Sequence, residues 1–427
     1  MADNQVHAIR GMHDVLPADI PAWHHLEDSY RALVESYGYQ QIRTPIVEKT
    51  ALFKRSVGEI TDIVEKEMYT FVDRNGDSLS LRPENTASVV RAVLDSGVIN
   101  GQLLRLWYCG PMFRHERPQK GRYRQFQQFG AETFGMAGAA IEAELIFIAA
   151  RFWKQLGLVD ISLQINTLGS SQCRSRFRQA LTSYFSDHHA SLDEDSQRRL
   201  QTNPLRLLDS KNPGMQALIN NAPRLQDYLS AESNEHFLQL QDILHNSAVS
   251  YEVNPTLVRG LDYYTHTVFE WVTDTLGAQG TVCAGGRYDG LLEQLGGRAG
   301  HAAGFAMGCE RLIAMLVDQD KAKTDYAVDA YLLMHGDEAL FAGQKMAESL
   351  RDELPQLKLV VHAGGGSLKS QMKKADKSGA EIALILGESE IASGSVSIKF
   401  LREDKPQITI SQAELAGKLG AAFKNTH

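Results

Sequence analysis

The 427-residue sequence has few cysteines and no long apolar run. Its four cysteines form no CxxC pair and lie at no metal-ligand spacing with histidine, which predicts neither a disulfide framework nor a zinc site. The longest apolar runs, such as residues 382–386, are far shorter than the roughly 20 residues that a membrane-spanning helix needs. The N-terminal residues lack the apolar stretch of a secretory signal. We therefore expect a cytoplasmic protein with no membrane segment. The cysteines are Cys109, Cys173, Cys283 and Cys309.

An excess of positive charge is also missing. The chain has 44 basic and 52 acidic residues, and its formal net charge is −8. Proteins that bind nucleic acid through general positive charge have the opposite balance. Any nucleic-acid partner must therefore be recognised through local basic patches and shape.

The first part of the chain mixes helix and strand patterns. Apolar residues at three- and four-residue steps predict a helix over residues 19–38. Residues 103–109 and 123–134 are strand-like and are joined by a polar, basic connection, which predicts a hairpin with a long loop. A second helix is expected over residues 142–156, and the alternating run 161–167 predicts a half-buried strand.

The remainder differs in character along its length. Residues 170–244 are polar and helix-like, which indicates a helical insertion, and strand and glycine patterns then resume. After a short charged linker, residues 326–427 alternate strand and helix, as in a small α/β domain. We therefore expect, for a chain of this length, a core of residues 1–169 and 245–322 interrupted by the insertion, followed by the C-terminal domain.

The most informative segment is Phe113–Phe126, which is rich in basic residues. A solvated basic loop is the ordinary interpretation of such a run. The returning strand favours a ligand-facing surface instead, because period-2 alternation puts an aromatic ring, an amide, a glycine and a carboxylate on one face. Arg114 could hold a phosphate at the end of the first strand. The residues sharing that face are Phe126, Gln128, Gly130 and Glu132.

Two further segments carry polar and glycine patterns. Leu257–Glu270 is a turn leading into a strand, and at the mouth of that strand it holds the fixed charge of Arg259 and the hydroxyls of Tyr263 and Tyr264. Ala284–Leu291 is rich in glycine, which is a weak indication alone.

The segment Gly304–Arg311 is also rich in glycine and leads into a helix. The first turn of that helix aims its N–H groups at an anion, and Arg311 lies in the same turn. No P-loop or dinucleotide-binding motif is present.

Leu79–Thr86 allows two interpretations. Its polar residues could cap the helix that begins near Thr86, or Glu84 and Thr86 could accept hydrogen bonds from an ammonium group. The histidine pairs at 24–25 and 188–189 have no further ligands at suitable spacing, so we predict no metal site.

Together these segments resemble the class II aminoacyl-tRNA synthetases and, within them, the histidyl-tRNA synthetases, over nearly the whole length. The resemblance implies an α+β fold: an antiparallel-sheet catalytic core with a helical insertion, and a C-terminal α/β anticodon-binding domain. Motif 1, a part of the dimer interface, is matched by the segment ending at Pro45. Motifs 2 and 3 are matched by Phe113–Phe126 and Gly304–Arg311, and the two histidine signatures by Leu257–Glu270 and Ala284–Leu291.

The resemblance also implies roles for single residues. Arg114 and Arg259 act at the α-phosphate, while Glu132 and Tyr264 meet the imidazole nitrogens of the substrate. Asn85 stands where the family usually has glycine. ATP, which brings Mg²⁺, is bound by Arg114, Glu116, Arg122, Phe126 and Arg311. Histidine is bound by Glu84, Asn85, Thr86, Arg114, Gln128, Glu132, Arg259, Tyr263 and Tyr264.

The implied activity is that of a homodimeric histidine–tRNA ligase. L-Histidine and ATP form histidyl-adenylate and pyrophosphate, and histidine then passes to the 3′ end of tRNA(His). One alternative is a histidine-binding regulatory subunit of ATP phosphoribosyltransferase. Such subunits share the catalytic core but typically lack the C-terminal domain and parts of the histidine signatures. Another is a related synthetase for proline or threonine.

Overall fold

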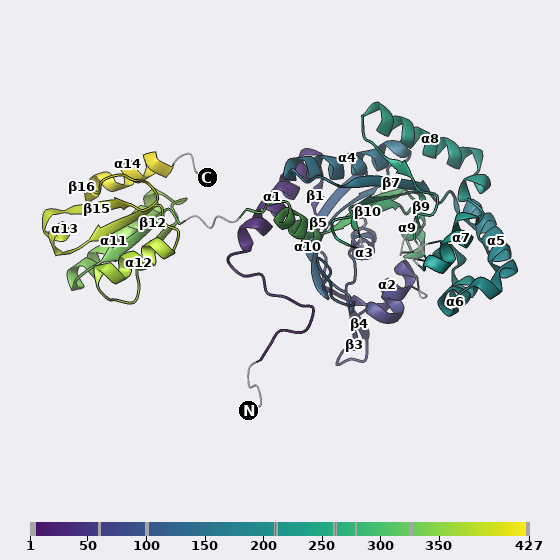
Figure 1. The fold of residues 1–427 in the computed structure, drawn as a ribbon, viewed down its shortest axis with the longest axis horizontal. Helices are drawn as coiled ribbons and strands as arrows, with labels where there is room; N and C mark the ends of the chain where they lie inside the picture. The colour runs from purple at the N-terminus through teal and green to yellow at the C-terminus, as the bar shows by residue number, and fades with distance from the viewer. Residues whose placement is uncertain are drawn as a thin grey trace. The chain divides into compact units, whose positions relative to one another are not determined.

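A computed structural model describes most of the chain, and it divides the chain into two compact units, Met1–Lys323 and Thr324–His427 (Figure 1). Across the described residues, no helix is long and apolar enough to cross a membrane. The described residues are 6–58, 61–98, 102–208, 210, 212–258, 261, 263–277, 280–323 and 328–423.

The first unit is built on an eight-stranded sheet of order β1-β5-β6-β11-β10-β9-β7-β8. The pairs β1·β5 and β7·β8 are parallel and the remaining pairs are antiparallel. The predicted hairpin is β5 with β6, and the predicted antiparallel character of the core is confirmed. The strands are β1 (Gln40–Gln41), β5 (Leu104–Phe113), β6 (Gln125–Phe134), β7 (Ser162–Thr167), β8 (Glu252–Val253), β9 (Thr265–Val272), β10 (Thr281–Arg287) and β11 (Ala302–Gly308).

One face of this sheet is packed against helices α1 (Ile20–Ser36), α4 (Ala139–Leu156) and α10 (Cys309–Asp318). The Tyr30 ring of α1 stacks on Phe129 of β6 with centroids 4.4 Å apart, within one buried apolar cluster. Because side chains alternate along a strand, the neighbours of Phe129 on β6 point to the opposite face. That opposite face is therefore free to carry a site.

Short elements from the N-terminal part border this free face. They form a three-stranded sheet of order β2-β4-β3, together with two helices and a π-helical turn. Strands of three or four residues are too short for a clear alternation pattern, so the sequence did not predict this sheet. The elements are β2 (Val47–Lys49), α2 (Thr50–Val57), η1 (Ile63–Glu67), β3 (Thr70–Val72), β4 (Ser78–Leu81) and α3 (Thr86–Ser96).

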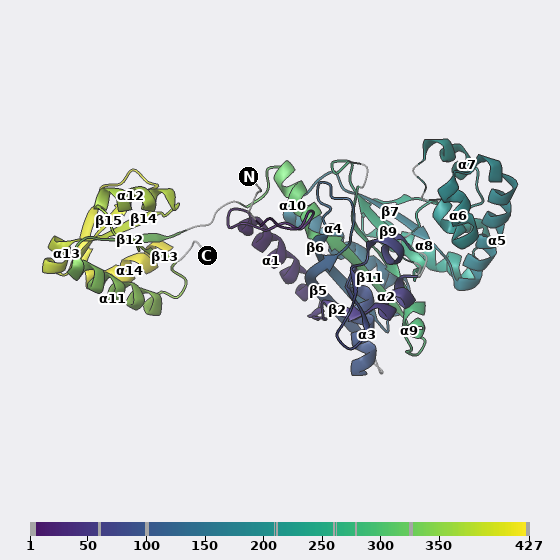
Figure 2. The ribbon, with the colours of Figure 1, turned by 90° about the horizontal axis from the view of Figure 1, so that it is seen from below.

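The insertion is helical, as predicted, and both views show α5, α6 and α7 gathered beyond one end of the large sheet (Figures 1 and 2). Phe177, Leu181 and Phe185 from one side of α5 belong to an apolar cluster that the insertion shares with the catalytic core. Its helices and 3-10 turns are α5 (Ser171–Asp187), η2 (His189–Ser191), α6 (Glu194–Thr202), η3 (Pro204–Leu207), η4 (Pro213–Met215), α7 (Gln216–Asn220), η5 (Leu225–Tyr228) and α8 (Ala231–Asn246).

The second unit is a five-stranded mixed sheet of order β13-β12-β14-β15-β16 with helices. Its first three strands and two helices alternate along the chain, as the sequence predicted for a small α/β domain, and β15 and β16 add an antiparallel edge that was not predicted. The elements are β12 (Ala330–Met334), α11 (Asp337–Glu353), β13 (Leu359–Val361), α12 (Leu368–Lys377), β14 (Ile382–Leu386), α13 (Glu388–Ser393), β15 (Ser395–Phe400), β16 (Ile408–Ser411) and α14 (Gln412–Phe423); α9 (Gly290–Gln294) belongs to the first unit.

Candidate active site

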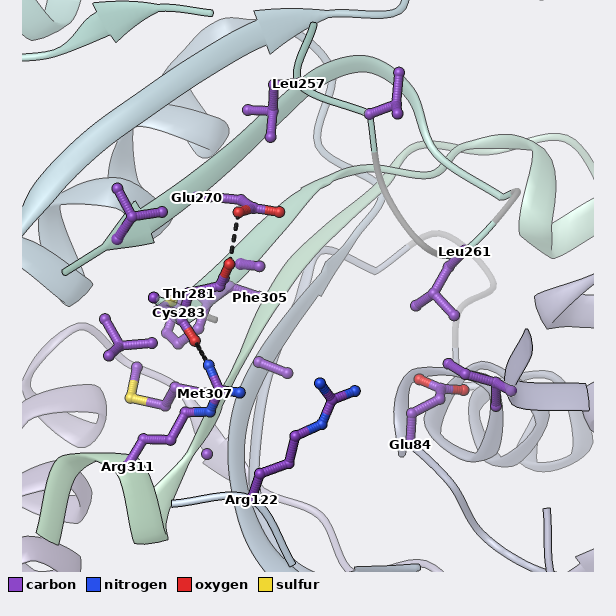
Figure 3. A pocket seen from close by; sticks show the side chains of 18 of the residues that line it. Glu84, Arg122, Leu257, Leu261, Glu270, Thr281, Cys283, Phe305, Met307 and Arg311 are labelled. Carbon is purple, nitrogen blue, oxygen red and sulfur yellow. Dashed lines mark hydrogen bonds between the residues drawn. The ribbon is translucent and has the colours of Figure 1, made fainter. Parts of the chain in front are cut away.

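A cavity of about 960 Å³ lies over the free face of the large sheet (Figure 3). Its walls include the β4–α3 connection, the β5–β6 hairpin, the segment before β9 and the start of α10, together with residues of β9, β10, β11 and the helical insertion. Parts of the chain that are far apart in sequence therefore meet around one space. The predicted residues on its walls are Glu84, Thr86, Arg114, Glu116, Arg122, Phe126, Gln128, Tyr263, Tyr264 and Arg311.

Three arginines face one end of the cavity. Figure 3 shows Arg122 and Arg311 extending toward the same space, and Arg114 lies over the Phe126 ring, 5.3 Å from its centroid. Burial, followed by the positive charges of Arg122 and Arg114, lowers the pKa of Arg311 to about 10. Such mutual repulsion is relieved when an anion binds, so this end suits a phosphate chain.

Each of these guanidinium groups is also held by the protein. The Arg114 Nε donates to the Pro83 carbonyl at 2.8 Å, Arg122 forms an ion pair with Glu116, and Arg311 donates to the Thr281 carbonyl. These bonds restrict the side chains before a ligand arrives. A preorganised set of cations is what stabilises developing charge on a phosphoryl group.

The other end of the cavity is polar. The Gln128 oxygen Oε1 is buried, and among the described residues it has no hydrogen-bond partner. A buried acceptor of this kind is costly unless a ligand satisfies it, and an ammonium group is a suitable donor.

Glu84 borders the same polar end and caps helix α3. Its carboxylate accepts hydrogen bonds from the backbone N–H groups of Thr86 at 2.7 Å and Ala87 at 3.0 Å. Burial raises the pKa of Glu84, although these bonds oppose the shift. The two interpretations of this segment are therefore compatible, because the capping carboxylate also lies on the cavity wall.

Glu132 is completely buried behind this wall. Its carboxylate accepts from the Thr86 hydroxyl at 2.7 Å, from Tyr108 at 3.4 Å and from Tyr288 at 2.5 Å. Burial raises the pKa of Glu132 to about 8. Thr86 and Tyr288 line the cavity and Glu132 holds both of them, so the carboxylate is set one layer deeper than a direct wall residue.

Two glycines make room for this arrangement. A Cβ atom on Gly304, which pairs with Glu132 across the strands, would lie 1.7 Å from the carboxylate oxygen Oε2. A Cβ atom on Gly130 would lie 2.2 Å from the Tyr108 ring, which crosses it on the way to Glu132. Any larger residue at either position must displace the carboxylate or its donor.

Comparison with known proteins identifies the family. A model of histidyl-tRNA synthetases matches residues 11–312, and a model of the anticodon binding domain matches residues 330–421. The chain belongs to the histidyl-tRNA synthetase family. It is therefore an aminoacyl-tRNA ligase of class II, a class that uses ATP, and the predicted family and fold are confirmed.

Solved structures agree with this assignment. The chain is 34% identical to the apo histidyl-tRNA synthetase of S. aureus, with a TM-score of 0.82, covering 97% of this chain and 100% of that one. The fold is shared with the histidyl-tRNA synthetase of Nostoc sp. PCC 7120, at 20% identity, TM-score 0.68 and coverage of 98% and 100%. It is also shared with an ATP phosphoribosyltransferase regulatory subunit/histidyl-tRNA synthetase from Bacillus halodurans, at 23% identity, TM-score 0.63 and coverage of 89% and 98%.

Asn85, where the family usually has glycine, faces away from the cavity wall. Its side-chain oxygen accepts from the Thr44 hydroxyl at 2.6 Å and from Arg82 at 3.1 Å, and it is almost fully buried. The asparagine therefore joins the β4–α3 connection to the segment that ends at Pro45. It leaves the Glu84 and Thr86 side chains on the cavity wall.

Two of the tyrosines around Glu132 were not predicted from the sequence. Tyr288 lies in the Ala284–Leu291 signature, whose sequence pattern is marked by its glycines, and Tyr108 lies in the middle of β5. Their position depends on strand register, which a sequence pattern does not reveal. The remaining predicted residue, Arg259, lies outside the described residues.

Proposed function

We propose that the chain is a histidine–tRNA ligase, which activates L-histidine with ATP and transfers it to the 3′ end of tRNA(His). The observation that supports this most is the composition of the cavity over the large sheet, where three arginines face a polar end rich in tyrosine, amide and carboxylate groups. A phosphate chain and a polar amino acid fit side by side in such a space. We further expect a cytoplasmic homodimer.

In the first step ATP lies with its phosphates at the arginine end. Its adenine stacks on Phe126, with Glu116 near the adenine amino group. A carboxylate oxygen of histidine attacks the α-phosphorus, the bond to the bridging oxygen breaks, and pyrophosphate leaves with Mg²⁺. Arg114 and Arg259 stabilise the charge on the α-phosphoryl oxygens, a contribution worth about 10²–10³ in rate for comparable donors.

Histidine lies at the polar end. Glu84, Thr86 and Gln128 surround its ammonium group, and Tyr264, with Tyr263 beside it, meets the imidazole. Glu132 completes the imidazole site from behind the cavity wall, through its hydrogen bonds to Thr86 and Tyr288. A different side chain leaves these buried polar groups unpaired, and sites of this type discriminate by about 10⁴–10⁵ without editing.

In the second step the acyl group passes to the terminal ribose hydroxyl of tRNA. Among the described residues we identify no side-chain base for this step, so we assign the proton to a phosphate oxygen of the adenylate, which leaves as AMP. The match of residues 330–421 to an anticodon binding domain supports a role in charging tRNA rather than the role of a regulatory subunit.

Aminoacylation of a tRNA(His) transcript by the full-length protein tests this proposal. The expected result is ATP-dependent attachment of labelled histidine to the transcript and none to a tRNA for another amino acid. Histidine binding by calorimetry without any charging would contradict it and favour a regulatory subunit.

A further inference from the structure

We propose that the helical insertion supplies a positioning residue to the amino-acid site, and that this residue is Arg174 of helix α5. Its Nη1 donates a hydrogen bond to the backbone carbonyl of Tyr264 at 2.5 Å, across 90 positions of the sequence. The bond is partly buried. This inference rests on the proposed function, because Tyr264 is the residue assigned to the imidazole.

The residues just before α5 form hydrogen bonds with His266, two positions after Tyr264. The backbone N–H of Leu168 donates to the His266 carbonyl at 2.6 Å, and the N–H of His266 donates to the Gly169 carbonyl at 2.9 Å. His266 has a φ of +47°, a conformation that a non-glycine residue adopts only when its surroundings impose it. The connection into α5 is therefore tied to the residues that follow Tyr264.

The insertion also reaches the beginning of this segment. The Asn166 amide on β7 donates to the Leu257 carbonyl at 3.0 Å, and Gln226 of η5 donates to the Asn166 oxygen at 3.4 Å. Figure 3 shows Leu257 at the wall of the pocket. Leu257 and His266 are thus both held by hydrogen bonds to β7 or to the connection between β7 and the insertion.

A second contact connects the insertion with the Tyr288 side of the site. His236 of α8 lies 2.9 Å from a carboxylate oxygen of the fully buried Glu142, and Glu142 accepts from Arg287, the residue before Tyr288. Burial opposes ionisation of Glu142, but the His236 hydrogen bond and the Arg287 charge outweigh it and lower its pKa. Both tyrosine-bearing segments therefore depend on helices of the insertion.

The rings of Tyr263, Tyr264 and Tyr288 pack against one another, so a shift of the Tyr264 backbone also moves the neighbouring rings. Tyr263 and Tyr264 are almost fully buried with ring centroids 4.7 Å apart, and Tyr263 contacts Tyr288 at 5.5 Å. Without the Arg174 bond, the Tyr264 carbonyl loses a charged donor and the peptide can rotate. Displacements of about 1 Å in a reacting site can cost on the order of 10²-fold in activity.

The test compares Arg174→Ala and Arg174→Lys with a matched control on the same helix. Arg176 also donates to a backbone carbonyl, that of Tyr228 at 2.9 Å, but this carbonyl belongs to the insertion itself. Each variant is assayed for histidine binding by calorimetry, for the KM of histidine and of ATP in pyrophosphate exchange, and for Tm.

We expect Arg174→Ala to raise the Kd and KM for histidine at least tenfold with the ATP KM changed less than twofold, because the freed peptide carries the Tyr264 ring assigned to the imidazole. Arg174→Lys recovers most of the loss, because lysine keeps a charged donor. Arg176→Ala leaves both KM values within twofold of the wild type.

Two results would overturn this inference. One is a histidine Kd within twofold of the wild type in Arg174→Ala. The other is that Arg174→Ala raises the KM of histidine and the KM of ATP equally and lowers Tm by the same amount as Arg176→Ala does. Failure of the proposed function gives a different result, because the wild-type protein then does not activate histidine in pyrophosphate exchange. In that case the variants are assayed with the amino acid that the wild type does activate.

Discussion

Tyr288 donates its phenolic hydrogen to the buried carboxylate of Glu132 at 2.5 Å, joining residues that are 156 positions apart. The bond connects the second histidine signature with the strand that returns from the arginine-bearing hairpin. The position of the Tyr288 hydroxyl, which lines the cavity, is therefore fixed by the Glu132 carboxylate, which lies behind the cavity wall.

Replacing Tyr288 with phenylalanine removes this donor and leaves the ring. We expect the KM for histidine to rise about tenfold and, below about pH 8, the free energy of unfolding to fall by about 0.5–1.5 kcal/mol, the usual contribution of a hydrogen bond between neutral groups, because the raised pKa keeps Glu132 protonated there. Pyrophosphate exchange and urea unfolding measure the two effects. Tyr108→Phe is the control, since its bond to Glu132 is longer, at 3.4 Å, and its effect should be smaller. A larger effect at Tyr108 contradicts this ranking.

Glu132 should make stability depend on pH. Burial raises its pKa from 4.5 to about 8 in the folded protein, so the folded state holds a proton that the unfolded state releases. The resulting stability is fully present below about pH 4.5 and is lost as pH rises through about 8. The difference in unfolding free energy between wild type and Glu132→Gln should therefore fall between pH 5.5 and pH 8.5 in urea titrations. Parallel curves for the two proteins would show that the pKa of Glu132 is not raised.

Gly304→Ala tests the space needed by the carboxylate. The added Cβ would lie 1.7 Å from Glu132 Oε2, so either the strand or the carboxylate must move. We expect a loss of about 1–3 kcal/mol in unfolding free energy, as for other overpacked sites, together with weakened histidine binding in calorimetry. Gly308→Ala on the same strand is the stability control, because its nearest neighbours lie 3.8 Å away. Equal stability of the two variants would argue against the close contact.

Arg259→Ala tests the charge assigned to the α-phosphate. We expect pyrophosphate exchange to fall by about 10²–10³-fold, the usual effect of removing a donor from a developing oxyanion, with Tm unchanged. Exchange within tenfold of the wild type contradicts the role of Arg259.

The sequence predicted most of the architecture, because the long elements have clear periodicity. The hairpin of β5 and β6 is an example, since ten-residue strands alternate visibly. The small sheet of β2, β3 and β4 was not predicted, because strands of three or four residues are too short to show a clear alternation of apolar and polar residues. Strands β15 and β16 were also not predicted, although apolar and polar residues alternate along both.

The site was predicted where one segment supplies several residues. Alternation along β6 placed Phe126 and Gln128 together, and both lie on the cavity wall. Contacts between distant segments could not be predicted from the sequence, because they depend on strand register and burial. The depth of Glu132, its bond to Tyr288 and the bonds that turn Asn85 toward Thr44 are all of this kind.

The most direct test of the central claim is ATP–pyrophosphate exchange by the full-length protein with each of the twenty amino acids in turn. The account predicts exchange with histidine, at least about 10⁴-fold above that with any other amino acid, because the buried polar groups around the imidazole are left unpaired by other side chains. Comparable exchange with proline, threonine or another amino acid, or none with histidine, would contradict it.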